Sequence, residues 1–300
     1  MKLLNQSVTL VTETNPLKCI ELAGKVTHKS EGNITEDSYK RFLINMLKVG
    51  HTATLEFGDV YIEALPEFEH YYDIYNIVPN GYSKFVDNKL YTNLRVLLNK
   101  CPELFVDYIE DNIHFGNKFI PEINDPYRRL TYHIITNRGI SHELVRHRVF
   151  SFMQESTRYC NYSNDKFGNE LNLINIAAPI DEYDMNVYNR QLGHIEESYM
   201  ELTTDGIKAQ IARGILPNDL KTEVYMCGFL KDWVGHNTEV STIDLFGESV
   251  DIKYHAGFDT LRRDKATHPQ AREIAEMIFE DITFQIGSTE FNKIKEIYYE

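Results

Sequence analysis

The sequence has few cysteines and no long apolar segment. Its cysteines lie far apart and form no Cys-x-x-Cys pair, which favours reduced structural thiols over a zinc site or a disulfide framework. They are Cys19, Cys101, Cys160 and Cys227. No apolar run approaches the roughly 20 residues that a membrane-spanning helix needs, and the first residues turn polar before a signal-peptide core could form. We therefore expect a cytoplasmic protein that does not contact a membrane.

Basic charge is also scarce, and the familiar phosphate-binding loops are missing. Lys and Arg number 31 against 45 Asp and Glu, which gives a formal net charge of -14. Long-range electrostatics would therefore repel nucleic acids and phosphates. The chain has neither a Walker loop nor a Gly-x-Gly-x-x-Gly motif. Any phosphate site must be local, and we expect no nucleic-acid partner.

What the chain does contain is clear hydrophobic periodicity. Apolar residues at helical spacing predict a helix over residues 36–50, and β-branched and aromatic residues predict a strand at 60–64. Residues 130–136 are typical of a buried strand. We expect a turn at 137–139 and take Ser141 as the N-cap of a short helix.

Longer elements are expected on either side of that strand. Residues 66–125 are rich in Tyr and Asn and are interpreted as an inserted subdomain. A helix within it is expected to carry Leu90, Leu94, Leu97 and Cys101. A long helix is predicted whose apolar stripe serves either as core or as a subunit interface. The stripe comprises Tyr188, Leu192, Ile195, Tyr199 and Leu202, extended by Ile207 and Ile211. A further helix should begin near Pro269 and carry Ile274, Met277 and Ile278.

One basic segment, residues 146–159, stands out in this acidic chain. It holds three arginines, a histidine and two serines within fourteen residues. Arginine forks bind phosphate oxygens in a bidentate way, and serine hydroxyls can complete the coordination. The alternative is a solvated face with surface ion pairs, which is what most charge runs are. On chemistry alone both interpretations stay open.

Two other interpretations of this segment are disfavoured. His142 and His147 lie five residues apart, whereas a helical zinc motif needs four, so the imidazoles would point apart. Cys160 lies beside the segment, but no base accompanies it locally, which argues against a nucleophilic thiol.

The segment resembles a known family motif. Arg146-His147-Arg148, seven further residues and then Ser156 are similar to the Arg-His-Arg-x7-Ser motif of flavin-dependent thymidylate synthases (ThyX). Other segments resemble the same family in the same order. They are Gly50-His51-Thr52 with Leu55-Glu56, the run from Asn137 to Val145, the run from Gln154 to Tyr159, Ala212-Arg213 with Leu216-Pro217, and Phe258-Asp259-Thr260-Leu261-Arg262.

The resemblance implies a fold and a reaction. The fold would be α+β, with a curved, largely antiparallel sheet and long helices, assembled as a homotetramer whose FAD site is shared between subunits. The reaction would be reductive methylation of dUMP to dTMP, with FAD carrying electrons from NADPH and 5,10-methylenetetrahydrofolate supplying the carbon. The whole chain, 1–300, would be one catalytic domain with insertions at about 66–125 and 238–254.

The resemblance also implies roles for individual residues. Arg262 would be catalytic, because a cation beside N3 of uracil stabilises the deprotonated, enolate-like base and makes C5 nucleophilic. The residues expected to hold FAD are Arg146, His147, Arg148 and Gln154. Those expected to hold dUMP are Glu143, Arg146, Gln154, Glu155, Ser156, Thr157, Arg158, Arg213 and Arg262. No metal ligand is implied.

The chain departs from the family pattern in places. Glu143 stands where many relatives carry Gln, so its contact to dUMP is less secure. Ala53 replaces a Ser or Thr, which would remove one hydroxyl contact to FAD. Arg263 follows Arg262 directly, so the catalytic arginine is ambiguous by one residue, although the Leu-Arg pairing favours Arg262.

Two functions of other classes remain as alternatives. A non-catalytic flavin- or nucleotide-binding sensor could keep the motif and bind dUMP without transferring a methyl group. An RNA-binding protein could use the basic segment, although the acidic balance of the chain disfavours it.

Overall fold

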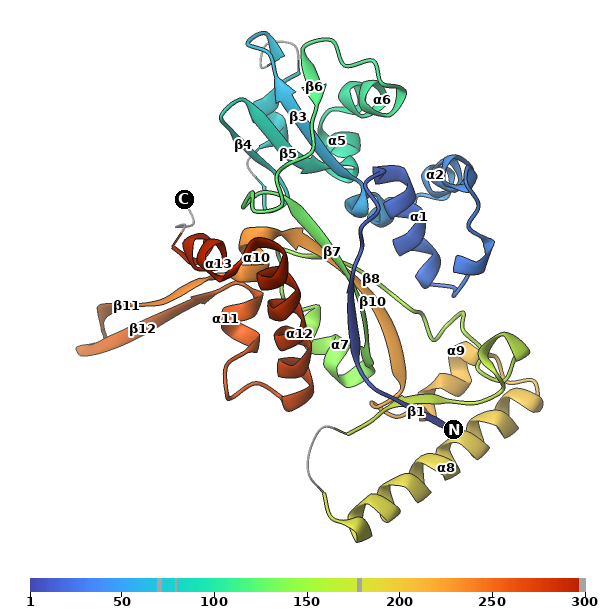
Figure 1. The fold of residues 1–300 in the computed structure, drawn as a ribbon. Coiled ribbons are helices and arrows are strands. Elements are labelled where there is room, and N and C mark those ends of the chain that lie inside the picture. The colour runs from blue at the N-terminus through green and yellow to red at the C-terminus, as the bar shows by residue number, and fades with distance from the viewer. Residues whose placement is uncertain (69–71, 79, 177–179, 297–300) are drawn as a thin grey trace.

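The computed structural model describes residues 1–68, 72–78, 80–176 and 180–296, and it is built around an antiparallel sheet (Figure 1). The strand order is β2 (Ser7–Leu10), β7 (Arg129–Asn137), β10 (Lys221–Phe229) and β8 (Ser151–Gln154). Every neighbouring pair in this sheet is antiparallel. A mixed architecture of helices and antiparallel sheet is therefore observed, as expected.

Helices cover both faces of this central sheet. On one face, α7 (Arg138–Leu144) and α12 (Pro269–Ile286) enclose a core with Tyr132, Met226 and Ile274. On the other face, α1 (Pro16–Val26) packs on Tyr225 and Cys227. Met226 and Cys227 point to opposite faces because successive side chains of a strand alternate. Burial on both faces explains the nearly continuous apolar character of β10.

A second sheet forms the upper part of Figure 1, in the order β4 (Lys84–Val86), β5 (Lys89–Asn93), β3 (Asp59–Ala64) and β6 (Gly116–Lys118). The helices α4 (Ile74–Ile77), α5 (Leu94–Lys100) and α6 (Pro102–Glu110) share its core. This core also includes Ile20 and Leu43 from earlier helices. Residues 66–125 therefore complete a sheet that begins with β3, and their origin as an insertion stays a prediction.

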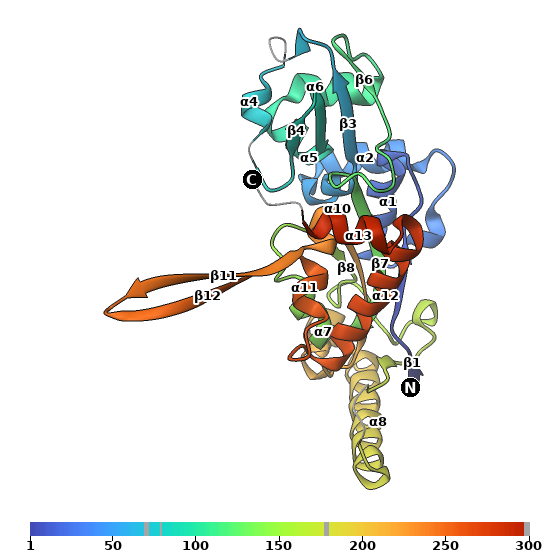
Figure 2. The same ribbon diagram turned by 60° about the vertical axis from the view of Figure 1, so that its left-hand side comes forward.

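A two-stranded hairpin projects from the body (Figure 2). Its strands, β11 (His236–Leu245) and β12 (Glu248–Ala256), contain most of the second predicted insertion. At its tip, Phe246 is 98% exposed. The hairpin follows α10 (Leu230–Val234) and leads directly into α11 (Phe258–Arg262), so its base lies next to the predicted catalytic arginine.

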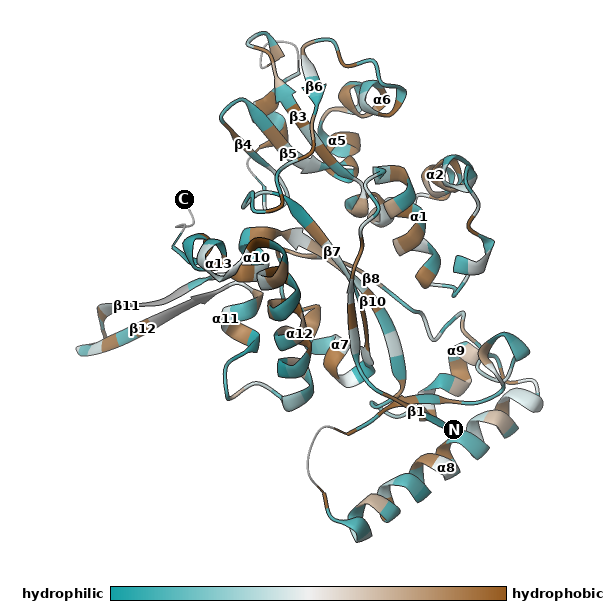
Figure 3. Ribbon diagram, viewed as in Figure 1, coloured by the Kyte–Doolittle hydropathy of each residue, from teal (hydrophilic) through white to brown (hydrophobic). Residues whose placement is uncertain are grey.

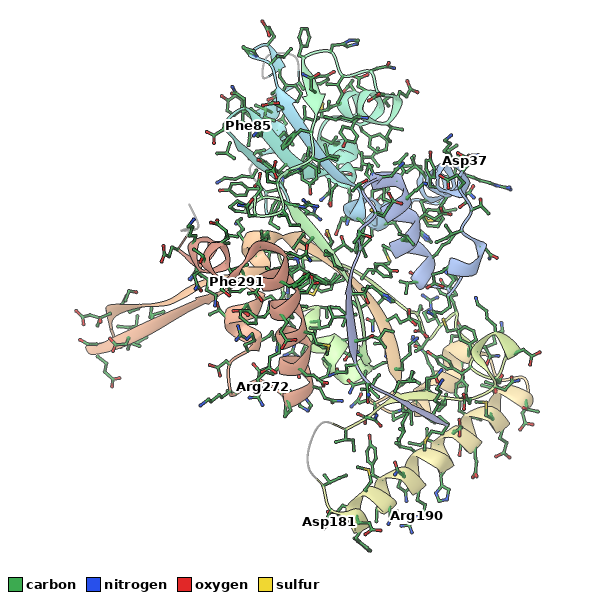
Figure 4. The ribbon with its side chains drawn as sticks, viewed as in Figure 1. Asp37, Phe85, Asp181, Arg190, Arg272 and Phe291 are labelled. Carbon is green, nitrogen blue, oxygen red and sulfur yellow. The ribbon has the colours of Figure 1, made fainter. Side chains whose placement is uncertain are left out.

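The long helix α8 (Glu182–Thr204) lies at the other end of the molecule, near the parallel pair β1 (Lys2–Leu4) and β9 (Asn172–Ile174). Its colours alternate along its length in Figure 3, as expected for a helix with one apolar side. Leu192 and Tyr199 pack in a core of the same chain. The first half of α8, with Asp181 and Arg190, extends away from the central sheet (Figure 4).

The remaining elements are short. They are α2 (Ser38–Lys48), α9 (Ala209–Ala212) and α13 (Ser288–Lys295), with the 3-10 turns η1 (Glu31–Asn33), η2 (Thr52–Phe57), η3 (Asp165–Phe167) and η4 (Arg213–Ile215). Within the described ranges, none of the helices combines the length and the apolar character needed to span a membrane.

Several sequence predictions are confirmed. The helix expected over 36–50 is α2, the strands expected at 60–64 and 130–136 are β3 and β7, and the helix expected near Pro269 is α12. Pro269 occupies the first turn of α12, where its missing N–H needs no partner.

The helix expected to run from Leu90 to Cys101 was wrong at its start. Leu90 lies in β5, and the helix α5 begins at Leu94. The side chain of Asn93 accepts a hydrogen bond from the backbone N–H of Val96 at 3.0 Å and so caps the helix. The leucine spacing fitted a helix, but an aromatic residue and a β-branched residue before the cap favour a strand.

The N-cap expected at Ser141 was also wrong. Asn137 caps α7, since its side-chain oxygen accepts from the N–H of Ile140 at 2.8 Å. Ser141 lies inside the helix, and its hydroxyl donates to the carbonyl of Arg138 at 2.9 Å. The expected turn at 137–139 is therefore the first turn of the helix.

The long apolar stripe ends earlier than predicted. α8 stops at Thr204, and Gly206 follows with a φ of 87°, which a continuing helix does not allow. Ile207 and Ile211 lie beyond this break, and Ile211 is 65% exposed. The periodicity continued in the sequence although the helix did not.

Candidate functional site

The basic segment follows the C-terminal end of α7 and leads into β8. Arg146, His147 and Arg148 lie in the turn between these two elements, and Gln154 ends β8. Arg146, Arg148 and Arg158 are exposed. In the part of the chain that the structure describes, no ion pair involves these three arginines, although acidic residues outnumber basic ones. Their guanidinium groups are available to an anion.

Arg262 reaches this segment from α11. Its Nη1 donates to Oε2 of Glu143 at 2.8 Å, and its Nη2 donates to the backbone oxygen of Glu143 at 2.7 Å. Its Nε donates to Nε2 of His147 at 2.8 Å. Glu143 thus holds Arg262 through both its carboxylate and its backbone oxygen.

His147 is an acceptor in this arrangement. Burial lowers the pKa of His147 to about 4, and the nearby charge of Arg262 adds to this effect. The ring is therefore neutral near pH 7, and Nε2 can accept a hydrogen bond from Nε of Arg262. His147 lies against the aromatic ring of Phe258, with 5.1 Å between ring centroids. The imidazole is placed to orient Arg262.

Arg262 and Arg263 are adjacent in the sequence, but their side chains contact different parts of the structure. Arg263 pairs with Asp259 at 3.0 Å, and its guanidinium lies 3.7 Å from the centroid of the Phe279 ring. Arg263 therefore packs against α12, whereas Arg262 contacts the basic motif. Arg262 also lines an open hollow of about 620 Å³ together with Glu143, Thr260, Leu261, Asp264, Ala266, Thr267 and His268.

A second group of predicted residues lies beyond the other end of β8. The backbone N–H of Ser156 donates to the carbonyl of Thr27 at 3.1 Å, and the Ser156 hydroxyl accepts from the N–H of Arg158 at 3.3 Å. Arg213 donates from Nη1 to the hydroxyl of Thr157 at 3.2 Å. Ser156, Arg158 and Arg213 are thus held close to one short loop.

Gln154 lies between these two groups. Its side-chain nitrogen donates to the hydroxyl of Ser141 at 2.8 Å and to that of Thr222 at 3.0 Å. It therefore links β8 to α7 and to β10. Across the described residues, no hydrogen bond or ion pair joins the Arg262 group directly to the Arg213 group. A strand of four residues spans roughly 13 Å, which keeps its two ends apart.

Glu155 has a different environment from its neighbours. Its side chain is 1% exposed, and its two oxygens contact the Tyr162 hydroxyl at 3.0 Å and Nζ of Lys221 at 2.9 Å. Lys221 also pairs with Glu223. The carboxylate of Glu155, which was predicted to contact dUMP, is thus engaged inside the protein and anchors the loop that follows.

Sequence reasoning missed the buried network around Glu223. Lys29 donates to Glu223 at 2.6 Å, and Nε2 of His133 lies 3.0 Å from it. Burial would raise the pKa of Glu223, but the bonds from His133, Lys221 and Lys29 hold it well below its usual range. No local pattern indicates this network, because its members come from four separate segments.

Three further residues were considered from the sequence, namely Cys160, Glu56 and His51. Cys160 is fully buried, and burial raises the pKa of its thiol to about 12, which disfavours a nucleophilic role. Glu56 forms an ion pair with Arg95 from α5. His51 precedes η2 and is exposed. The four cysteines are free thiols.

Comparison with known proteins finds a family similar to part of the chain. Residues 128–236 match the family described as "Thymidylate synthase complementing protein". A flavin-dependent thymidylate synthase of Geobacter sulfurreducens is 32% identical over 29% of this chain and 37% of its own length. A probable flavin-dependent thymidylate synthase of Paramecium bursaria Chlorella virus 1 is 30% identical over 38% of this chain and 56% of its own length.

A longer match joins the chain to a flavin-dependent thymidylate synthase of Synechocystis, 27% identical over 49% of this chain and 62% of that protein. The chain thus spans between about a third and two thirds of the curated relatives it matches. Among solved structures, a UMP/dUMP methylase from Streptomyces cacaoi bound with 5-Br dUMP is 13% identical, with a TM-score of 0.40 over 99% of both chains.

The matched segment contains the basic turn, β8, the loop after it and Arg213, whereas Arg262 lies outside it. The motif residues and the family match therefore fall on the same part of the fold. Residues 128–236 are thus similar to this family, and the curated relatives found for the chain are flavin-dependent thymidylate synthases.

Proposed function

We propose that this protein methylates dUMP to dTMP, with 5,10-methylenetetrahydrofolate as carbon donor and NADPH-reduced FAD as hydride source. The observation that carries the proposal is the contact of Arg262 with Glu143 and His147. This contact joins an arginine from outside the matched segment to the family motif. It assembles at one place the cation and the basic turn that the reaction requires.

The residues present suit a flavin. Arg146 and Arg148 are exposed cations without an ion pair among the described residues, and the diphosphate of FAD would supply the missing negative charge. We propose that Arg146, His147, Arg148 and Gln154 hold FAD, which supplies the hydride when bound. His147 would contribute as the residue that fixes Arg262.

The second group suits a nucleotide phosphate. Ser156, Arg158 and Arg213 offer a hydroxyl and two guanidinium groups around one loop, and Thr157 already orients Arg213. We propose that these residues hold the phosphate and sugar of dUMP. We also propose that Arg146 contacts dUMP. For Glu143 and Glu155 the proposed contact to dUMP is weaker, since both already have protein partners.

Arg262 would act on the uracil ring. Its permanent charge, placed beside N3 and the adjacent carbonyl, would stabilise the deprotonated ring and make C5 nucleophilic. The bond to His147 fixes Nε, so the two Nη groups, now on Glu143, are those that would turn to the base. No cysteine nucleophile is needed in this scheme.

We also propose a homotetramer with sites at subunit junctions. The Arg262 group and the Arg213 group occupy opposite ends of β8, and no polar contact joins them directly within the described chain. A flavin and a nucleotide that must meet would then be held by surfaces of more than one subunit. We expect the protein to act in the cytoplasm.

The decisive test is an assay of purified protein with dUMP, methylenetetrahydrofolate and NADPH. We expect a yellow protein that oxidises NADPH only when dUMP is present and that forms dTMP. A colourless preparation that cannot bind FAD would contradict the proposal. Binding of dUMP and FAD without dTMP formation would instead support a non-catalytic sensor.

A further inference from the structure

The second sheet contacts the basic motif through Tyr82. The Tyr82 hydroxyl donates to the backbone oxygen of Arg148 at 3.2 Å. The turn that carries Tyr82 is itself fixed, since Oδ1 of Asn80 accepts from the N–H of Tyr82 at 2.8 Å. The next residue, Ser83, shares a hydrogen bond of 2.6 Å with Thr92 of β5. Tyr82 is therefore presented to Arg148 by a rigid turn.

Arg95 makes a second contact, which joins α5 to η2. It lies in the first turn of α5, which Asn93 caps, and it pairs with Glu56 of η2. The backbone oxygen of Glu56 also accepts from Nη2 of Arg129 at 3.0 Å. Arg129 is in turn paired with Asp59 at 2.7 Å. Glu56 is thus held from the second sheet and from the central sheet together.

The two connections are neighbours in space. Burial raises the pKa of the Tyr82 hydroxyl, and the charge of Glu56 adds to the rise, while Arg129 and Arg95 oppose it. The hydroxyl therefore lies within electrostatic reach of the Arg95–Glu56 pair. Tyr82 with Arg148 and Arg95 with Glu56 are thus two separate contacts near the junction of the sheets.

We infer that, given the flavin site proposed above, Tyr82 and Arg95 are positioning residues for it. Tyr82 fixes the backbone of Arg148, so the exposed guanidinium of Arg148 starts from a defined position when it binds a flavin phosphate. Arg95 fixes Glu56 near the same junction. Both residues come from the stretch interpreted as an insertion. Residues 66–125 would therefore support the cofactor site and would not be a subdomain unrelated to it.

The placement predicts a selective effect. Tyr82 contacts Arg148 in the turn before β8. Ser156 and Arg158 lie in the loop after β8, at the opposite end of this strand. Loss of the Tyr82 hydroxyl should therefore weaken FAD binding and leave dUMP binding unchanged. A residue that served only general stability would weaken both ligands together.

The first test compares Tyr82→Phe with Tyr75→Phe in the full-length protein. Tyr75 lies in the same sheet unit and is 78% exposed. We expect Tyr82→Phe to raise the Kd for FAD about three- to tenfold, the effect of one lost hydrogen bond. Its Kd for dUMP should stay within about twofold of wild type, as for an independent site. Tyr75→Phe should change neither constant.

The second test concerns Arg95. Arg95→Met should raise the Kd for FAD about tenfold or more, because it leaves the Glu56 carboxylate without its ion pair at this junction, and Arg95→Lys should restore part of the affinity. Arg41→Met, which removes an exposed arginine from α2, is the matched control. Circular dichroism and Tm of each variant verify that it is folded.

The outcomes separate this inference from the proposed function. Wild-type protein that binds FAD while Tyr82→Phe and Arg95→Met bind it equally well would overturn the positioning roles alone. Equal weakening of FAD and dUMP would also overturn them, since it would indicate a general structural effect. Failure of the wild type to bind FAD would overturn the proposed function and the positioning roles together.

Discussion

The Nε group of Arg262 donates to Nε2 of His147 at 2.8 Å, and this bond joins two segments 115 positions apart in the sequence. It places a permanent cation against a neutral imidazole at the end of the basic turn. Because Glu143 holds both Nη groups, the guanidinium is oriented from two directions. The bond gives the predicted catalytic arginine a fixed position before any substrate is present.

Removal of Arg262 should abolish turnover without loss of the flavin. We expect Arg262→Ala to keep its yellow colour and to form dTMP at least about 100-fold more slowly, as when a single electrostatic stabiliser is removed. Flavin absorbance and a dTMP assay measure the two effects. Arg263→Ala is the control, and it should lower Tm while turnover stays near wild type. Loss of turnover in Arg263→Ala alone would reverse the two roles.

His147 should make stability depend on pH. Its pKa is about 4 in the fold against an ordinary value of 6.5, so between these values the unfolded chain binds a proton that the folded chain does not. The free energy of unfolding should therefore decrease as the pH falls from 6.5 towards 4, by about 3 kcal/mol at most for this residue.

Urea unfolding of wild type and His147→Gln at pH 7 and pH 5 measures this effect. The stability difference between the two proteins should be smaller at pH 5, because only the wild type loses the contribution of the neutral imidazole. An unchanged difference would mean that His147 titrates equally in the folded and unfolded chains.

Gly257 should tolerate no side chain. A Cβ there would lie 2.0 Å from Cα of Gly235, and the φ of 85° also disfavours other residues. Gly247 at the hairpin tip has the same φ of 85° but no atom within 4 Å of a Cβ. We expect Gly247→Ala to cost about 1–3 kcal/mol, the range for backbone strain, and Gly257→Ala to cost clearly more.

Gly257→Ala should also lose dTMP formation, because α11 begins at the next residue and carries Arg262. Thermal unfolding and the dTMP assay on both variants check this. Equal costs for the two substitutions would show that the close contact with Gly235 relaxes easily.

Lys221 should matter for stability more than an exposed lysine. It pairs with Glu155 and Glu223, whose side chains are 1% and 10% exposed. Lys221→Met should destabilise the protein by about 3–5 kcal/mol, because it removes the shared cation from two buried carboxylates. Lys40→Met removes an exposed pair with Asp37 and should leave the urea midpoint close to that of wild type. Similar urea midpoints for both variants would contradict a stabilising network.

Periodic patterns predicted the main elements well where burial is regular. The strand β7 and the helix α12 follow from their apolar spacing, because each buries one defined set of side chains. The pattern was misleading at element ends. Leu90 kept helical spacing with Leu94 across a strand-to-helix junction, and Ile211 kept it beyond a glycine that had already ended α8.

The contacts of the site were harder to predict from the sequence than the helices and strands. The motif indicated Arg146, Arg148 and Ser156 by resemblance, and their ligands stay predictions. Contacts such as Lys29 with Glu223, 194 positions apart, leave no local pattern to recognise. They arise because the central sheet brings distant segments together, and only a tertiary structure shows such pairs.

The state of the thiols has a practical consequence. Burial raises the pKa of Cys19, Cys101, Cys160 and Cys227, so each is a poor thiolate near neutral pH. A cysteine introduced at Phe246, which is 98% exposed at the hairpin tip, would react far faster with a maleimide dye. The natural sequence thus offers a nearly silent background for single-site fluorescence labelling of the hairpin.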